Sequence, residues 1–139
     1  ADIACMCDAF LDLLRIRASS TLFRLRSADD IRARLSFRNV GAAQNPVVMA
    51  VHLDGVGYPG AGFREVLYFI NASPDAQTLA LPEEAGKAYT LHPVQRAAGS
   101  ADARLRDARY DADGGRFVLP GRSAVVFVLE DTGSDAAQP

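Results

Sequence analysis

From residue 35 onward the chain is a series of short runs rich in β-branched and aromatic residues, separated by turn-forming segments. The separators contain Gly, Pro, Asn and Asp, which supply the backbone angles that tight turns need. Strands at this spacing are typical of an antiparallel sandwich rather than of parallel βαβ units. We therefore predict a mainly β fold, an antiparallel β-sandwich of about eight strands, from the runs LSFRNV, VVMAVHL, EVLYFIN, QTLAL, AYTLHPV, LRDARY, RFVLP and SAVVFVLE.

Two helices are predicted before the strands. Apolar residues recur at three- and four-residue intervals from Ile3 to about Arg17, which indicates an amphipathic helix. Ser27, with an acidic residue three positions later, is a helix-start pattern, so a short second helix is predicted for residues 28–34. The apolar stripe of the first helix is wide for a small domain and consists of Ile3, Met6, Phe10, Leu13 and Leu14.

Length and composition exclude several classes of protein. The chain has 139 residues, the usual size of one domain, and a net charge of −2. No apolar run approaches the roughly 20 residues of a membrane helix, so no membrane span is predicted. Seven arginines lie within residues 15–38, but aspartates are interleaved with them, which favours a solvated, salt-bridged surface over a nucleic-acid face. The polar C-terminal residues 131–139 are expected to form a flexible tail.

The residues alone reveal no catalytic or metal constellation. His52 and His92 are the only histidines, neither lies in a motif, and a structural role is the preferred interpretation of both. Cys5 and Cys7 have no second ligand pair at zinc-site spacing. The segment DADGG at 111–115 lacks the later ligands of a calcium loop, and a hairpin turn explains it better. No metal or cofactor is predicted.

One loop is a candidate for carbohydrate binding. Tyr58 and Phe63 lie among four glycines in DGVGYPGAGF, and aromatic rings exposed on a loop stack on sugar rings. The same residues could equally be ordinary anchors of a loop. Tyr110 is the remaining aromatic candidate, and the absence of Trp counts against a sugar platform.

The opening segment DLLRIRASSTLFRLRSADDIRARLSFRNVG resembles the region where pullulanase-type α-1,6-glucosidases, the starch-debranching enzymes of the α-amylase superfamily, leave their catalytic barrel. Later pieces resemble the C-terminal region of the same family in the same order. They are VVMAVHLDG, VLYFINASPDAQTLALP, YTLHPVQ and ARYDADGGRFVLPGRSAVVFV. The resemblance covers the chain from about Phe10 to Val128.

The resemblance implies a division of the chain into residues 1–26, equivalent to the last barrel helix and a connection, and a C-terminal β-sandwich at 27–130. The family's catalytic carboxylates lie in the barrel, so none is carried onto this sequence. The implied function is a non-catalytic accessory domain that packs on the (β/α)8 barrel of a debranching enzyme, with the apolar stripe as its docking surface. An isolated domain would then be expected to associate, for example as a dimer, through that stripe. The alternatives are an α-glucan-binding module and a free-standing interaction domain.

Overall fold

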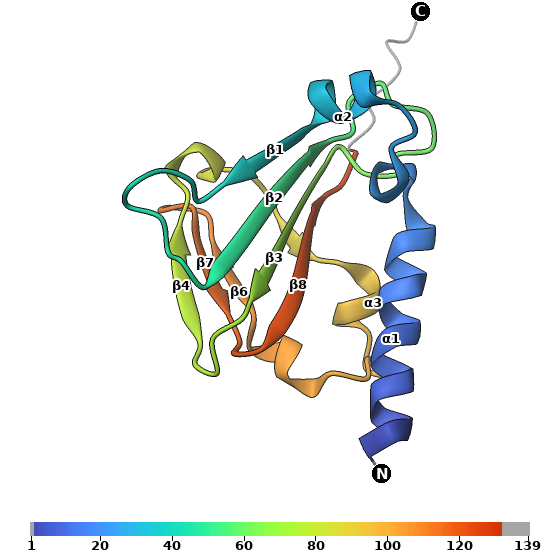
Figure 1. Cartoon of the computed structure of the whole chain (residues 1–139), viewed down its shortest axis with the longest axis vertical. Helices are drawn as coiled ribbons and strands as arrows, with labels where there is room; N and C mark the ends of the chain where they lie inside the picture. Colours follow the sequence, from blue (N-terminus) through green and yellow to red (C-terminus); the bar gives the residue numbers. More distant parts are fainter. Residues whose placement is uncertain (1, 132–139) are drawn as a thin grey trace, which may run out of the picture.

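The computed structural model describes residues 2–131, with side chains described from Ala4 onward (Figure 1). It begins with helix α1 (Asp2–Ser19), a 3-10 turn η1 (Thr21–Arg24) and helix α2 (Ala28–Arg34). The Ser27 hydroxyl accepts a hydrogen bond from the Asp30 backbone N–H and so caps α2. Both predicted helices are therefore confirmed. Residues 132–139, most of the predicted tail, lie outside the described residues.

Eight antiparallel strands form two sheets, which confirms the predicted sandwich. The five-stranded sheet has the order β1-β2-β3-β8-β5 and the three-stranded sheet the order β4-β7-β6. The strands are β1 (Leu35–Arg38), β2 (Val48–Asp54), β3 (Glu65–Asn71), β4 (Gln77–Ala80), β5 (Thr90–Leu91), β6 (Arg109–Asp111), β7 (Arg116–Leu119) and β8 (Ser123–Leu129).

The main core lies between the two sheets. Along β3 the side chains alternate, so that Leu67 and Phe69 face the smaller sheet and are fully buried. The ring centroids of Phe69 and of Phe117 on β7 lie 4.8 Å apart. Further aromatic side chains of the same cluster pack around this pair. The larger sheet thus places one face inside the sandwich and presents its other face outward.

The outward face of the larger sheet is covered over part of its area by the N-terminal segment. Val66 on β3 and Val128 on β8 are buried there with Ile16 of α1 and Leu22 of η1. Ile16 and Leu22 precede the boundary predicted at residue 26, yet they belong to the same buried cluster as the strands. Within residues 2–131 no helix has the length and apolar character needed to cross a bilayer.

Three predicted runs differ in detail. The run AYTLHPV yields only the two residues of β5, because Pro93 begins the short helix α3 (Pro93–Arg96). The run LRDARY divides into a 3-10 turn, η3 (Ala103–Asp107), and β6. Another 3-10 turn, η2 (Pro82–Glu84), follows β4.

The hairpin predicted around DADGG joins β6 to β7 as expected. Gly115 has φ +59°, and a Cβ there would lie 2.3 Å from the Leu81 carbonyl oxygen, so only glycine fits. Asp111 accepts hydrogen bonds from Arg116 and from the Asp113 backbone N–H. These contacts close the turn.

Candidate functional site

Helix α1 exposes most of its large apolar side chains. The exposed fraction runs from 44% for Leu13 and Leu14 to 75% for Met6, with Phe10 at 59%. These residues follow the three- and four-residue spacing that places them along one side of the helix. The side chain of Ile3, the fifth residue of the predicted stripe, lies outside the described side chains. The remaining four are therefore available to a partner.

A different side of α1 faces the sandwich, and it is held by polar contacts as well as by Ile16. The Asp12 carboxylate is buried; it accepts a hydrogen bond from the Ala101 backbone N–H at 2.9 Å and another from Arg15 at 2.8 Å. At 100° per residue, this inner side lies about 120° around the helix from the exposed stripe. The helix is thus fixed to the domain without covering its own apolar residues.

His92 binds the C-terminal end of α1 through a hydrogen bond to Ser19. Its Nδ1 accepts the Val94 backbone N–H at 3.2 Å, so Nε2 carries the ring proton and donates it to the Ser19 hydroxyl at 3.0 Å. The Ser19 hydroxyl in turn donates to the Ile16 carbonyl at 2.6 Å. Burial lowers the pKa of His92 to about 4, so the ring is neutral at pH 7. This structural role agrees with the one predicted for His92.

An apolar groove connects α1 to the outward face of the larger sheet. Its volume is about 320 Å³, and Leu13 and Ile70 line it from opposite sides. Beyond the groove the sheet exposes more large apolar side chains, because α1 covers only part of it. We call the combined surface the apolar face: Met6, Phe10, Leu13 and Leu14 on α1, with Phe37, Met49 and Ile70 on the sheet.

The two aromatic residues predicted for sugar binding are not an exposed pair. Phe63 is only 9% exposed and packs edge-on against His92, with ring centroids 5.4 Å apart. Of the two interpretations left open by the sequence, the burial of Phe63 fits the loop anchor, because the loop closes on η1 through a hydrogen bond from the Thr21 N–H to the Gly60 carbonyl. Tyr58 is half-buried beneath the Arg34 guanidinium, which lies 4.7 Å from its ring centroid.

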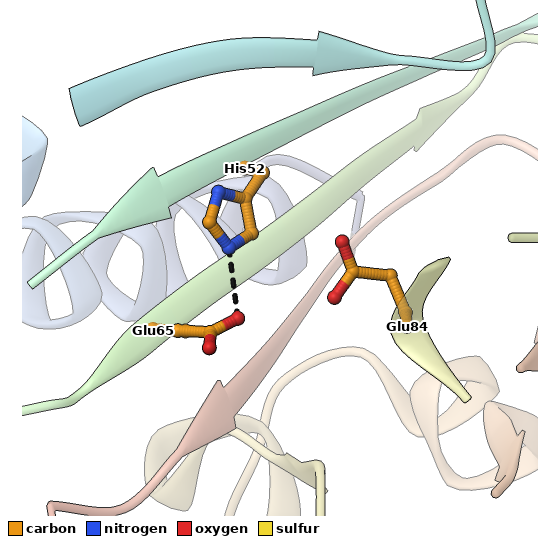
Figure 2. A group of neighbouring side chains, drawn as sticks. All are labelled: His52, Glu65 and Glu84. Atoms are coloured by element: carbon orange, nitrogen blue, oxygen red, sulfur yellow. Dashed lines mark hydrogen bonds and ion pairs between the residues drawn. The ribbon is translucent and has the colours of Figure 1, made fainter. Parts of the chain in front are cut away.

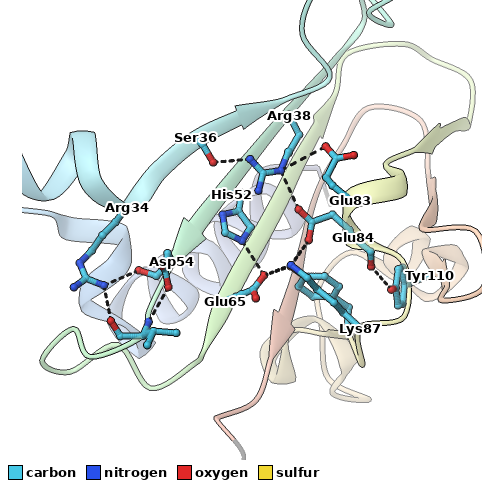
Figure 3. Close-up of polar contacts among 12 residues, drawn as sticks. Arg34, Ser36, Arg38, His52, Asp54, Glu65, Glu83, Glu84, Lys87 and Tyr110 are labelled. Carbon is cyan, nitrogen blue, oxygen red and sulfur yellow. Dashed lines mark hydrogen bonds and ion pairs between the residues drawn. The ribbon is translucent and has the colours of Figure 1, made fainter.

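A second candidate site is a cluster of charged side chains at one end of the sandwich. His52 on β2 and Glu65 on β3 point into the space between the sheets, and Glu84 of η2 approaches them from the other side (Figure 2). His52 Nε2 lies 2.8 Å from Glu65 Oε2. The Lys87 ammonium lies 2.7 Å from the Oε2 atoms of both glutamates, and Arg38 donates to the Oε1 of Glu84 at 2.9 Å (Figure 3).

The protonation states of this polar cluster follow from those contacts. Burial alone would raise the pKa of Glu65, but hydrogen bonds from Lys87, His52 and Tyr89 outweigh it and lower the pKa to about 2. The pKa of Glu84 is lowered in the same way, with Arg38 in place of His52. Both carboxylates are therefore ionised at pH 7, and neither holds the proton that a glycosidase acid must donate.

The polar cluster also contains the donor atoms of a possible metal site. One ligand atom from each of His52, Glu65 and Glu84 lies within 4.8 Å of the others. The Lys87 ammonium, however, already contacts both carboxylates, so the position that a cation would occupy carries a positive charge of the protein itself. The arrangement is that of a partly buried ion-pair network that joins the larger sheet to η2.

Reasoning from the sequence missed this polar cluster. Glu84 and Lys87 stand in no motif that predicts such a cluster. One feature of the sequence does indicate a buried charge. Glu65 begins the apolar run EVLYFIN and lies two residues before Leu67, so it faces the same inward side of the strand. His52, Glu65 and Glu84 come from separate segments of the sequence, and only the folded chain brings them together.

Comparison with known proteins gives a consistent result. The family described as "Alpha-1,6-glucosidases, pullulanase-type, C-terminal" matches residues 1–130. Pullulanase 1, chloroplastic, of Arabidopsis thaliana is 37% identical over 131 residues, which cover 89% of this chain and 13% of that protein. The pullulanase of Klebsiella pneumoniae is 29% identical over 133 residues, covering 93% and 12%.

Solved structures agree with the sequence comparison. The crystal structure of PulA from Klebsiella oxytoca superposes with a TM-score of 0.84 at 28% identity and covers 100% of this chain and 13% of that one. A maltotriose complex of PulA from Klebsiella pneumoniae gives a TM-score of 0.79 at 30% identity and covers 92% and 14%. The chain thus spans about an eighth of the length of these relatives.

Proposed function

Because this chain belongs to the C-terminal domain family of pullulanase-type α-1,6-glucosidases, we propose that it is a non-catalytic accessory domain. In this proposal it packs against the catalytic (β/α)8 barrel of a larger debranching enzyme and stabilises it. The partner is supplied by the same polypeptide, since the relatives are about eight times longer than the matched region.

The exposed stripe of α1 carries this proposal. The helix is held to its own domain by Asp12, Ile16 and Ser19. Phe10 and Leu14 remain in solvent, and an exposed apolar stripe of this kind marks a surface for a partner. Burying one such side chain fully contributes about 1.5–3 kcal/mol. The groove and the exposed residues of the sheet extend the surface beyond the helix.

The chemistry of the polar cluster supports a non-catalytic role. The neighbouring carboxylates of Glu65 and Glu84 are bridged by Lys87, and the pKa values of both are lowered. Hydrolysis of a glycosidic bond needs one protonated and one ionised carboxyl on either side of the sugar. We infer that this cluster stabilises the sandwich.

The test is a pair of matched substitutions in the full-length parent enzyme. Phe10→Ser removes a central residue of the stripe, and Val56→Ser changes a loop residue of nearly equal exposure, 58% against 59%. Docking predicts that Phe10→Ser lowers the melting temperature of the parent by several degrees, while Val56→Ser leaves it unchanged. Equal melting temperatures for the two variants would refute the docking role.

The alternative from the sequence, an α-glucan-binding module built on Tyr58 and Phe63, is not favoured by the geometry. The Phe63 ring is buried in the cluster between the N-terminal segment and the larger sheet. The Tyr58 ring is covered on one face by the Arg34 guanidinium. A sugar platform needs an open aromatic face.

A further inference from the structure

Two hydrogen-bond donors, the Tyr68 hydroxyl and the Arg17 guanidinium, belong to residues that line the apolar groove. Tyr68 lies in the middle of β3, and strand alternation places its side chain on the same outward side as that of Ile70. Arg17 follows Leu13 by four positions on α1, so these two side chains lie on the same side of the helix. The sheet and the helix thus each bring one donor to the same groove.

Neither donor has an acceptor in the described part of the chain. Within residues 4–131, no residue accepts a hydrogen bond from the Tyr68 hydroxyl or forms an ion pair with Arg17. Backbone acceptors of the sheet are already used, because β3 pairs along its whole length with β2 and β8, and the Ala124 carbonyl accepts from Gln95. The two donors are therefore satisfied by water as long as the groove is open.

The protonation state of Tyr68 is fixed by its surroundings. Its ring is half-buried and packs on Phe23, with the ring centroids 6.5 Å apart. Burial raises the pKa of Tyr68 above its ordinary value, so the hydroxyl keeps its proton at pH 7 and can donate it. Arg17 is the only charged residue among the described residues that line the groove.

A partner that covers the apolar side chains also removes the water that serves these donors. A donor that is buried without an acceptor costs free energy, and an unpaired guanidinium costs more because it is charged. The covering surface must therefore supply an acceptor. A carboxylate meets both requirements, since it accepts from the hydroxyl and neutralises the guanidinium through a charge-assisted bond.

Resting on the docking role given above, we propose that the segment of the parent enzyme that covers the apolar groove carries an aspartate or a glutamate. Its carboxylate binds Arg17 and the Tyr68 hydroxyl, and an apolar side chain of the same segment enters the groove between Leu13 and Ile70. The volume of about 320 Å³ admits one large side chain.

A second copy of this chain is the competing occupant of the groove. The relatives are about eight times longer than the matched region, so the parent polypeptide is attached to this domain. An attached partner acts at a high effective concentration, whereas a second copy must associate from solution. The attached segment is therefore the favoured occupant.

The first test compares melting temperatures of the full-length parent enzyme and of the 139-residue chain. Tyr68→Phe keeps the ring and removes the hydroxyl, and Arg17→Glu places a negative charge against the carboxylate. We expect Tyr68→Phe to lower the melting temperature of the parent by about 1–3 °C and Arg17→Glu to lower it further. In the 139-residue chain both groups stay in water, so each variant should change it by less than about 1 °C.

Tyr58→Phe and Arg26→Glu are the matched controls. Tyr58 is also half-buried and Arg26 is also exposed, but both line a different cleft. Neither control should lower the melting temperature of the parent more than that of the 139-residue chain.

Cross-linking in the parent enzyme identifies the carboxylate. Arg17→Lys supplies an amine, which a carbodiimide joins to a contacting carboxylate as an amide, with loss of water. Mass spectrometry of the digested protein should show position 17 joined to an acidic residue outside the 139-residue segment. Arg26→Lys should give no such link.

The proposal is overturned if Tyr68→Phe and Arg17→Glu leave the parent as stable as the two controls do, or if they lower the parent and the 139-residue chain equally. It is also overturned if position 17 forms no link, or links only to this segment or a second copy of it. Phe10→Ser separates this failure from failure of docking. It still destabilises the parent if only the carboxylate is absent, and it has no effect if the domain does not dock.

Discussion

The Ser19 hydroxyl lies 3.0 Å from Nε2 of His92 and joins the last residue of α1 to the residue that precedes α3. The ring of His92 is 1% exposed, and its second nitrogen accepts the Val94 N–H. A protonated ring would carry an N–H at both nitrogens, so it would lose the bond from Val94 and place an unpaired charge in the core. The position of α1 on the sandwich therefore depends on a neutral His92.

Stability is consequently expected to fall between pH 6.5 and about 4. The unfolded chain takes up a proton at His92 below its ordinary pKa of 6.5, whereas the folded chain does so only below about 4. The contribution is therefore complete above pH 6.5 and is lost as the pH falls, by about 3 kcal/mol in total. Urea unfolding at several pH values measures it.

His92→Gln is the matched variant for this prediction, because it removes the titrating ring and keeps a hydrogen-bonding side chain. The free energy of unfolding of this variant should vary less between pH 6.5 and 4 than that of the unmodified chain. An identical pH profile in the two proteins would contradict the role assigned to His92.

Lys87→Met is expected to destabilise the domain at neutral pH. It leaves the carboxylates of Glu65 and Glu84 side by side without the ammonium that lies 2.7 Å from each. Because Lys87 is 29% exposed, the cost is discounted from the 3–5 kcal/mol of a fully buried pair to roughly 2 kcal/mol. Loss of the lysine also raises both pKa values, so the deficit should shrink as the pH falls and the carboxyls gain protons.

Chemical denaturation of Lys87→Met at pH 7 and pH 4 tests this account. Glu83→Gln serves as the control, because the neighbouring Glu83 is half exposed and lies outside the bridge that Lys87 forms. The control should change stability by less than about 0.5 kcal/mol. A Lys87→Met deficit that is independent of pH would show that lost packing, not lost charge, is its cause.

Asp12→Ala should loosen α1. The substitution leaves the Ala101 backbone N–H without its acceptor, which costs about 1–3 kcal/mol for a buried donor. Asp12→Asn is the control, since its amide oxygen still accepts that N–H. Hydrogen exchange of the α1 amides should accelerate in the alanine variant and change little in the asparagine variant. Equal rates in both variants would mean that the hydrogen bond does not hold the helix.

The sequence predicts the elements of this fold well, because each depends on local pattern. The Ser27 cap, the alternation along EVLYFIN and the glycines of the β6–β7 turn all act over a few residues. The contacts that place elements against one another are less predictable. For Phe63 the sequence leaves an exposed sugar contact and a loop anchor equally open, because its burial depends on a loop closure to Thr21, 42 positions earlier.

The apolar face should cause the isolated chain to associate in solution. The seven large apolar residues of the apolar face remain exposed, and apolar surface of this kind is removed from water by self-association when its partner is absent. Phe10→Ser together with Leu14→Ser should shift sedimentation toward the monomer, whereas Val56→Ser, at a similarly exposed site in a loop, should not. A chain that is monomeric without any substitution would show that the apolar face is too weak to pair with itself. Association unaffected by the α1 substitutions would instead locate the contact on the sheet, where Met49→Ser and Ile70→Ser are the next variants.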